Sequence, residues 1–357
     1  MKKLIYCLLL LLIISSCNRN SSYSELYRNN DQTSELQDSH DIDINSYYLS
    51  LTTSYEDERG VLSEAYVVYD FVSNVAETKM TIEATSAYPC GVCDITDNVV
   101  YYIAAAPTYI GDKLVMLDNL YEKNIDSDSV RQLTYDGIYI NKMLVVNDRI
   151  YFIAGQRSKT GVDFGYYDLN TKELFFSSEN EESGVLATDI SYHAGKNEYV
   201  LSWFSDVEQN ALFNQFYEKQ QQNIENVYAS YADNYIDLVD GEGKLIENIV
   251  TVKGVDVYEA SVSLDETTVF ITGIREKEDT PIAALYRDGE WIEIKNINIG
   301  NAILSPCGNQ IFYIDYIHAE NSTVPHSILY CYDIESDETT EMYEFDTYVN
   351  NMVLLPK

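Results

Sequence analysis

The sequence predicts an all-β fold, a six-bladed β-propeller whose blades are four-stranded antiparallel sheets. Three observations predict it. A short hairpin pattern returns five times along the chain, the first unit lacks its innermost strand, and a C-terminal segment matches the strand that is missing. Regular repetition of short strands separated by turn residues is typical of propellers.

The recurring pattern is a short strand, a turn of Asp, Asn or Gly, and then a β-branched and aromatic run. A second hairpin follows each copy, most clearly at residues 165–176 and 328–338, so each unit supplies the four strands of one blade. The copies occupy residues 93–102, 144–152, 191–201, 263–270 and 305–312. Measured at Val100, Ile150, Tyr199, Val269 and Ile311, they are spaced by 50, 49, 70 and 42 residues.

The first unit begins near Tyr47, with strand-like residues at 47–51 and 65–70 and no innermost strand before them. Residues 348–355 match residues 139–146, the innermost strand of the third unit. We therefore expect the C-terminal strand to complete the first blade and close the ring, which removes the open edges of the sheet.

The 70-residue interval predicts an insertion of about 20 residues in blade 4, between residues 206 and 234. There Ala211, Leu212, Phe213, Phe216 and Tyr217 recur near helical spacing, which predicts one short amphipathic helix. Phe213 and Phe216 would then serve a lid or a partner-docking element. The alternative is that the apolar side of this helix covers the propeller.

Two of the hairpins carry a family resemblance. Residues 305–312 (Ser-Pro-Cys-Gly-Asn-Gln-Ile-Phe) and residues 263–266 (Ser-Leu-Asp-Glu) resemble the Ser-Pro-Asp-Gly-Lys hairpin of TolB-type propellers, with Cys307 in place of the usual Asp. The resemblance covers residues 45–357 as a repeat pattern. It implies the six-bladed fold, and a shared fold does not carry a function.

The first residues form a secretory signal, with two lysines, an apolar run at residues 4–14 and small residues before Cys17. The run is shorter than the roughly 20 residues of a membrane-spanning helix. Residues 14–17 (Ile-Ser-Ser-Cys) resemble the bacterial lipobox, which implies that Cys17 carries a diacyl anchor of palmitate-like chains. Two such chains give stable membrane attachment. The alternative is an ordinary cleaved signal with a chance cysteine.

The domain organisation follows from this start. Residues 1–16 are the predicted lipoprotein signal peptide, residues 17–45 the lipidated cysteine and a flexible tether, and residues 46–357 the propeller. The tether is polar and without sustained periodicity, so it cannot bury enough apolar surface to order itself. We expect a protein lipid-anchored to the cell membrane and facing outside the cytoplasm, at the cell surface or in the periplasm.

The charge of the chain restricts its partners. The formal net charge is −35, and losing Lys2 and Lys3 with the signal leaves 21 basic against 58 acidic residues, or −37. Phosphate backbones and anionic headgroups would be repelled, which argues against nucleic acid and against docking of the propeller on lipid. The alternative reading of this charge is solubility.

A candidate binding face is predicted from aromatic residues that precede the innermost strands. Tyr88, Tyr139, Tyr258 and Tyr348 each lie four residues before an inward apolar position, where the other two units have Leu186 and Ile299. Tyrosines near one mouth of the channel would offer apolar area and a hydroxyl to a ligand. Alternatively, they pack between blades as part of the repeat.

Cys90 and Cys93 form the sharpest local motif, Cys-Gly-Val-Cys. A redox pair needs a helix N-terminus and a zinc site needs a second close pair, and the sequence predicts neither, so a structural disulfide or free thiols are expected. The four histidines are too scattered for a multi-histidine metal centre, and no nucleophile elbow occurs. We predict no metal, no cofactor and no catalytic residue.

Three functions remain open at the level of sequence, and the third of them is a purely structural scaffold or an accessory subunit of an envelope complex. The first is a non-catalytic module that binds a protein, peptide or glycan on the channel face. The alternative is an envelope enzyme, a hydrolase or lyase, that uses carboxylates in the channel. Two or more inward acids with raised pKa values would favour the enzyme, and a channel of Tyr, Ser and aliphatic residues would exclude it.

Overall fold

The computed structural model describes residues 43–110, 112–156, 161–177, 184–222, 230–276, 280–295, 297, 300–317 and 325–357. The predicted signal peptide, Cys17 and the tether up to residue 42 lie outside the described residues. From there the chain forms a short 3-10 helix, η2 (Ile44–Ser46), whose N-cap Asp43 accepts a hydrogen bond from the N–H of Asn45 at 2.9 Å. Within the described ranges, no helix has the length and apolar character to cross a bilayer.

The described residues form six four-stranded antiparallel sheets, so the predicted propeller is confirmed. Blade 1 is β24 (Tyr348–Pro356), β1 (Tyr47–Glu56), β2 (Leu62–Asp70) and β3 (Val75–Glu83). Blade 2 is β4 (Gly91–Asp94), β5 (Val99–Ile110), β6 (Lys113–Asn124) and β7 (Ser129–Gln132). Blade 3 is β8 (Ile138–Val146), β9 (Arg149–Gln156), β10 (Asp163–Asp168) and β11 (Leu174–Phe176).

The remaining blades follow the same order from the innermost strand outward. Blade 4 is β12 (Val185–His193), β13 (Glu198–Ser205), β14 (Asn234–Val239) and β15 (Leu245–Val252). Blade 5 is β16 (Val255–Val262), β17 (Thr268–Arg275), β18 (Thr280–Arg287) and β19 (Glu290–Glu293). Blade 6 is β20 (Ala302–Leu304), β21 (Gln310–Ile317), β22 (His326–Asp333) and β23 (Glu338–Phe345).

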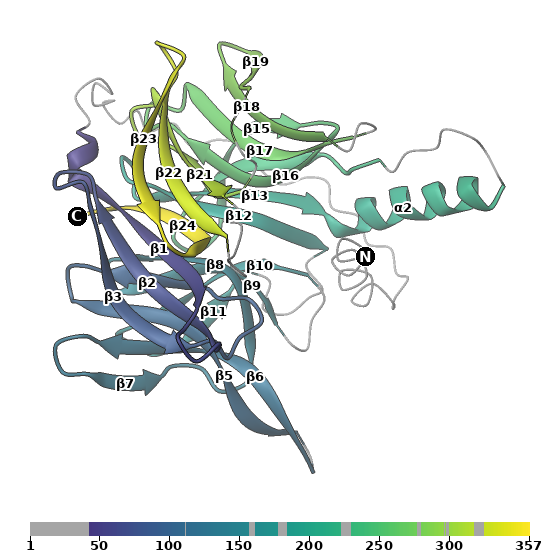
Figure 1. The fold of residues 1–357 in the computed structure, drawn as a ribbon. Coiled ribbons are helices and arrows are strands. Elements are labelled where there is room, and N and C mark those ends of the chain that lie inside the picture. The colour runs from purple at the N-terminus through teal and green to yellow at the C-terminus, as the bar shows by residue number, and fades with distance from the viewer. Residues whose placement is uncertain are drawn as a thin grey trace. The chain divides into compact units, whose positions relative to one another are not determined.

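The predicted closure of the ring by the C-terminal strand is confirmed. β24 pairs antiparallel with β1 from Tyr47↔Pro356 to Ser54↔Tyr348, and it forms the innermost strand of blade 1 (Figure 1). Its apolar side chains are buried in the core, among them Val349 and Met352. Both ends of the propeller chain are thereby held in one sheet, and no innermost strand position is left empty.

The hairpin turns and the aromatic run explain why the repeat folds as it does. Asn98, Asn147 and Asn197 adopt φ values of 53°, 53° and 56° in the turns that the pattern predicted. Asn tolerates this left-handed region better than most residues, so it fixes the tight connection between the first two strands of a blade. The aromatic run that follows enters the core, where Phe152 and Phe270 are fully buried.

The insertion in blade 4 contains a helix, as predicted, α2 (Asp206–Gln221), but the helix is not amphipathic, because its apolar side chains do not gather on one face. Its N-cap Ser205 accepts a hydrogen bond from the N–H of Glu208 at 3.2 Å. Gln209 anchors the first turn of α2, because its side chain donates to the Ser230 carbonyl and accepts from the Ala232 N–H. Gln209 is the one buried residue of α2, and the helix projects away from the sheets (Figure 1), so it does not bury an apolar side on the propeller.

The two faces of the ring carry different features. Tyr348 starts β24 at the face that we call the mouth face, and Pro356 ends it at the opposite face, close to η2. The long β5–β6 hairpin and α2 both connect the second strand of a blade to the third, so both project on the side of the mouth face (Figure 1). The described chain therefore enters and ends on the face opposite its largest projections.

Candidate binding site at the channel mouth

A polar hollow of about 280 Å³ lies at the mouth end of the central channel. Five blades each contribute two consecutive residues to its wall. These pairs are Asn141 and Lys142, Thr188 and Asp189, Tyr258 and Glu259, Gly300 and Asn301, and Asn350 and Asn351. Toward the opposite face, blades 1, 4, 5 and 6 leave a hollow of about 20 Å³. The smaller hollow has room for about one water molecule, so the larger hollow is the one that can hold a ligand group.

β-bulges build the wall of this hollow. The pairing register shifts by one residue at Asn141 in β8, Thr188 in β12, Tyr258 in β16 and Asn350 in β24. A bulge leaves one residue unpaired and re-aims the side chain that follows it. In these four blades of the described chain, the following side chain is thereby turned into the channel.

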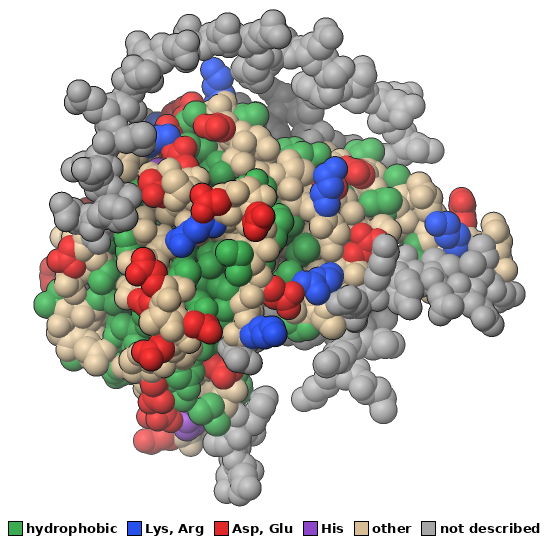
Figure 2. Space-filling model, turned by 90° about the horizontal axis from the view of Figure 1, so that it is seen from above, with side chains coloured by type: hydrophobic (Ala, Val, Ile, Leu, Met, Phe, Trp, Pro, Cys, Tyr) green, Lys and Arg blue, Asp and Glu red, His purple; other side chains and the backbone are tan. Residues whose placement is uncertain are grey.

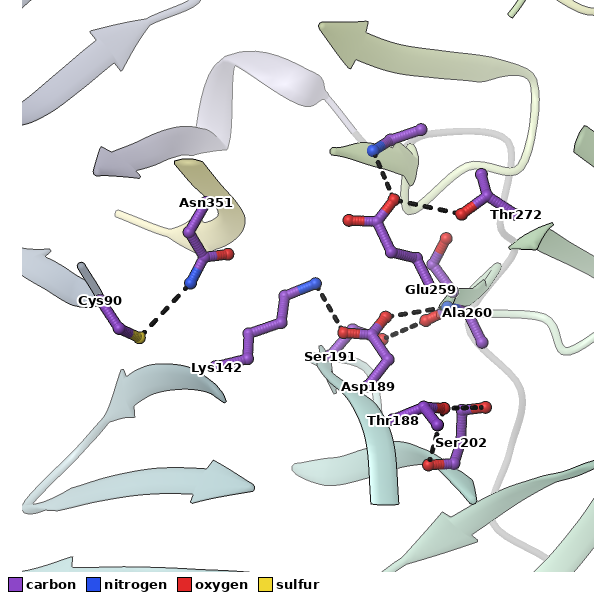
Figure 3. Close-up of polar contacts among 12 residues, drawn as sticks. Cys90, Lys142, Thr188, Asp189, Ser191, Ser202, Glu259, Ala260, Thr272 and Asn351 are labelled. Atoms are coloured by element: carbon purple, nitrogen blue, oxygen red, sulfur yellow. Dashed lines mark hydrogen bonds and ion pairs between the residues drawn. The ribbon is translucent and has the colours of Figure 1, made fainter. Parts of the chain in front are cut away.

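The re-aimed side chains belong to a set of six that we call the polar ring, with one residue from each blade. Its members are Cys90, Lys142, Asp189, Glu259, Asn301 and Asn351. Figure 3 shows five of them around the channel, with their contacts. Each member reaches the next blade, so the ring joins all six sheets.

The neutral members of the ring make hydrogen bonds across blade boundaries. Asn351 of blade 1 donates its Nδ2–H to the sulfur of Cys90 in blade 2, at 3.5 Å. The backbone N–H of Met143 in blade 3 also faces the Cys90 sulfur and acts to lower the pKa of that thiol. Asn301 of blade 6 donates from Nδ2 to the Val349 carbonyl in blade 1, at 3.2 Å. These contacts tie together blades 6, 1, 2 and 3.

The charged members complete the circle. Lys142 Nζ of blade 3 lies 2.6 Å from Asp189 Oδ1 of blade 4, and both side chains are buried. The other Asp189 oxygen accepts the N–H of Ala260 in blade 5 at 2.8 Å, and Glu259 Oε2 accepts the N–H of Ala302 in blade 6 at 2.7 Å. An innermost strand has a free edge toward the channel, so these carboxylates satisfy backbone donors that would otherwise have no protein partner.

Burial and charge set the protonation of this cluster. Burial raises the pKa of Glu259 to about 7, against the ammonium of Lys142, which lowers it. Burial also raises the pKa of Asp189, and Lys142 again opposes the rise. Burial alone would lower the pKa of Lys142, but the carboxylates of Asp189 and Glu259 outweigh it and raise that pKa. The channel therefore holds two acids and one fixed ammonium.

The predicted tyrosines do not occupy one equivalent position. Tyr88, Tyr139 and Tyr258 are 59%, 45% and 39% exposed on the mouth side. Tyr348 is partly buried and stacks on Tyr316 of blade 6 with 4.7 Å between ring centroids, which is the packing between blades given as the alternative. Tyr258 is itself the bulged residue of β16, so of the four it is the one that lines the hollow.

The other predicted site residues lie elsewhere. Phe213 and Phe216 are partly exposed on α2 and do not line the hollow. Cys90 and Cys93 are both free thiols, so the disulfide expected as one alternative is not formed. Along extended chain, residues three apart are separated by about 10 Å, beyond the roughly 6.8 Å that a disulfide can bridge. Burial raises the pKa of both thiols to about 12.

Sequence reasoning missed the polar ring. The signal was present, because Lys142 and Asn351 lie three residues after Tyr139 and Tyr348, and Asp189 lies three residues after Leu186. Tyr139, Leu186 and Tyr348 occupy the same position in their blades. In blade 5 the strand pairing places Asp256 at that position, two residues before Tyr258. Aligning on tyrosine therefore displaced blade 5 and hid the common position of Glu259.

The likeness to known structures supports the fold. No protein-family model matches the sequence, and no curated protein matches it. The structure resembles TolB from Acinetobacter baumannii with a TM-score of 0.54 at 12% identity, over 88% of this chain and 68% of that chain. At this identity the likeness shows a TolB-like propeller fold and no more.

Two further solved structures are less similar. Dipeptidyl peptidase 4 from Porphyromonas gingivalis matches with a TM-score of 0.42 at 11% identity, over 83% of this chain and 45% of that one. A candidate 6-phosphogluconolactonase from Bacteroides fragilis matches with a TM-score of 0.45 at 8% identity, over 87% and 98% of the two chains.

Proposed function

We propose that this chain is a lipid-anchored extracytoplasmic protein whose propeller binds a protein, peptide or glycan partner at the channel mouth without catalysing a reaction. One observation carries the proposal. The hollow is walled by amides and hydroxyls, while its charged groups are already engaged with one another or with the backbone. Such a surface offers hydrogen bonds to a polar ligand and keeps its acids occupied.

The size of the hollow supports a partner larger than the site. Ligand pockets for whole small molecules span about 300–1,000 Å³, and this one is about 280 Å³. It suits one polar group of a larger partner, such as a sugar ring or an amide side chain. The exposed rings of Tyr88 and Tyr139 on the mouth side would supply flat contact area around it.

The first described residues and the C-terminal residue lie together, on the face opposite the mouth. The described chain starts at η2 on the face opposite the mouth, where the Lys357 N–H donates to the Ser46 carbonyl at 2.8 Å.

Peptide and glycan arrays with the protein in detergent test the binding proposal. We expect saturable binding that Asn141→Ala weakens at least tenfold, while the thermal midpoint stays unchanged. Asn170→Ala, in an exposed turn outside the hollow, is the matched control and should bind normally. Binding that survives changes in the wall of the hollow would contradict the proposal.

The lipid anchor has a separate test. Cells fed an alkyne-bearing palmitate analogue should label the protein and retain it in the membrane fraction. Cys17→Ala should lose both the label and the membrane retention, and Cys307→Ala should lose neither. Labelling that persists in Cys17→Ala would contradict anchoring at this residue.

An envelope hydrolase or lyase is the second candidate function, and the criterion stated for it from the sequence is met, because the channel holds two inward acids, Asp189 and Glu259, whose pKa values burial raises. Burial raises the pKa of Glu259 to about 7, a value suited to general acid–base catalysis at neutral pH, and its Oε1 is not the oxygen that caps Ala302 (Figure 3). A bound ligand recovered chemically unchanged after long incubation is expected for the binding module. Turnover that Glu259→Gln abolishes would favour the enzyme instead.

A further inference from the structure

The β5–β6 hairpin extends far beyond the rest of blade 2. Its strands pair over their whole length, from Val99↔Asn124 to Ile110↔Lys113. Their neighbours are much shorter, because β4 pairs with β5 only at residues 99–102 and β7 pairs with β6 only at residues 121–124. The outer half of the hairpin is therefore a two-stranded ribbon with an edge on each side (Figure 1).

The edge of β6 carries open backbone groups. Leu120 directs its backbone outward, where its carbonyl accepts from the Leu133 N–H at 2.8 Å and its N–H donates to Thr134 Oγ1 at 2.9 Å. In a continuous antiparallel ladder, every second residue directs its backbone the same way. Asp118, Met116 and Leu114 therefore direct theirs outward too, and we call these three residues the outer edge. No described residue hydrogen-bonds the outward groups of Leu114 or Met116.

The edge of β5 is protected as far as Pro107, in contrast. The backbone N–H groups on the side of β5 away from β6 have hydrogen-bond partners. The Ile103 N–H donates to the Cys90 carbonyl and the Ala105 N–H donates to Thr85 Oγ1, each at 3.0 Å. The next position is Pro107, which has no N–H to offer. Proline is a common device against unwanted strand pairing. The outer edge of β6 has no such residue.

Apolar side chains accompany the open edge. Tyr109 pairs with Leu114 and Pro107 pairs with Met116, so these four side chains share one face of the ribbon. Tyr109, Leu114 and Met116 are 74%, 57% and 60% exposed. A contiguous exposed apolar strip beside unpaired backbone is a combination that soluble proteins usually avoid.

We infer that the outer edge of β6 binds an extended polypeptide segment of a partner protein, which adds to the ribbon as a third strand. A polypeptide backbone in β conformation presents alternating N–H and C=O groups at the spacing of this edge, and its alternate side chains can pack on Leu114 and Met116. A second copy would bring a charge of −35 against −35, so a neutral or basic segment is favoured. Figure 2 shows acidic side chains spread over the face of the molecule that is seen from above. This surface is separate from the hollow.

Hydrogen exchange of the full chain in detergent tests the inference, with an eight-residue peptide of alternating Val and Lys as the probe. We expect the amides of Leu114, Met116 and Asp118 to exchange at least tenfold more slowly with the peptide bound. The amides of Val115 and Leu117, which face β5, should not change. A peptide of the same length with Pro replacing each Val cannot form a strand, and it should protect none of them.

Side-chain variants provide the second measurement. Leu114→Ser combined with Met116→Ser should weaken peptide binding at least tenfold. The matched control is Leu62→Ser combined with Val75→Ser, which changes two similarly exposed residues of blade 1 and should leave binding intact. Unchanged thermal midpoints would show that both variants fold.

Three outcomes would overturn the inference. One is the absence of protection at saturating peptide. Another is protection that depends on protein concentration without peptide, which would assign the edge to a second copy. The third is protection without peptide that is lost on deleting residues 18–42, which would assign the edge to the chain itself.

Discussion

The polar ring and the tip of the β5–β6 hairpin lie on the same side of the propeller. They differ in whether the backbone groups at their strand edges have hydrogen-bond partners. In the ring, the inner edges of blades 5 and 6 are capped by Asp189 and Glu259 of the preceding blades. At the hairpin tip, the outward groups of Leu114 and Met116 have no partner among the described residues. The first region therefore stabilises the fold, and the second is free to serve a partner.

The physical setting explains the difference. A buried polar group without a partner costs about 1–3 kcal/mol, so the crowded channel must satisfy its groups internally. At the hairpin tip, water can satisfy open backbone groups at little cost. Changes in the ring should therefore alter stability strongly, and changes at the tip should alter it little.

Removing the ammonium of Lys142 should have the largest effect on stability. Lys142→Ala leaves Asp189 as a buried carboxylate without its cation, and we expect a loss of about 3–5 kcal/mol in the free energy of unfolding. Urea unfolding followed by tyrosine fluorescence measures it. Lys123→Ala, which breaks an exposed pair with Asp128, should cost less than about 1 kcal/mol. Equal losses in the two variants would contradict the structural role of the ring.

The pH dependence of stability is the second test. Burial raises the pKa values of Glu64 and Glu259 to about 7 in the folded chain, from ordinary values near 4.5. Between these values the folded state binds more protons than the unfolded state, so the free energy of unfolding should fall as pH rises. The stabilisation is complete below about pH 4.5 and is lost above about pH 7, and it amounts to about 3 kcal/mol for each group.

Urea unfolding at several pH values measures this trend. Glu64→Gln combined with Glu259→Gln should flatten the curve between pH 4.5 and 7, whereas Glu335→Gln, in an exposed turn, should leave its slope unchanged. A stability that climbs steadily across that range in the unaltered chain would show that the two acids are not held protonated by the fold.

A smaller effect is expected for Asn351→Ala. This change removes the hydrogen bond to the Cys90 sulfur that links blades 1 and 2. A single neutral hydrogen bond contributes about 1 kcal/mol, so the urea midpoint should shift modestly without a change in the slope of the transition. No shift at all would indicate that the blades are held together here without this contact.

The smallest effect is expected at the hairpin tip. Leu114→Ser and Met116→Ser change exposed side chains beside an unpaired edge, so each should alter the free energy of unfolding by less than about 0.5 kcal/mol. Thermal unfolding detects a larger change. A loss comparable to that of Lys142→Ala would mean that the tip is part of the core, and the contrast between the two regions would fail.

The repeat made the fold predictable, because each copy encodes a hairpin turn, an inward apolar position and an aromatic run together. The match between residues 348–355 and 139–146 was enough to place the closing strand. The polar ring was missed because the bulges shift register within the innermost strands, and a bulge such as the one at Tyr258 has no fixed sequence signature. The length of the β5–β6 hairpin was missed because the repeat pattern ends at residue 102, well before β5 does.

Native-state hydrogen exchange tests the contrast between these regions most directly, because it reads both in one experiment. The Ala260 and Ala302 N–H groups lie on the channel-facing edges of their strands, where the carboxylates of Asp189 and Glu259 accept their hydrogen bonds. We predict that these two amides exchange only as slowly as global unfolding allows. The Leu114 and Met116 amides should exchange at nearly the rate of an unstructured peptide. Rapid exchange at Ala260 and Ala302, or slow exchange at Leu114 and Met116 in the unbound protein, would contradict the account.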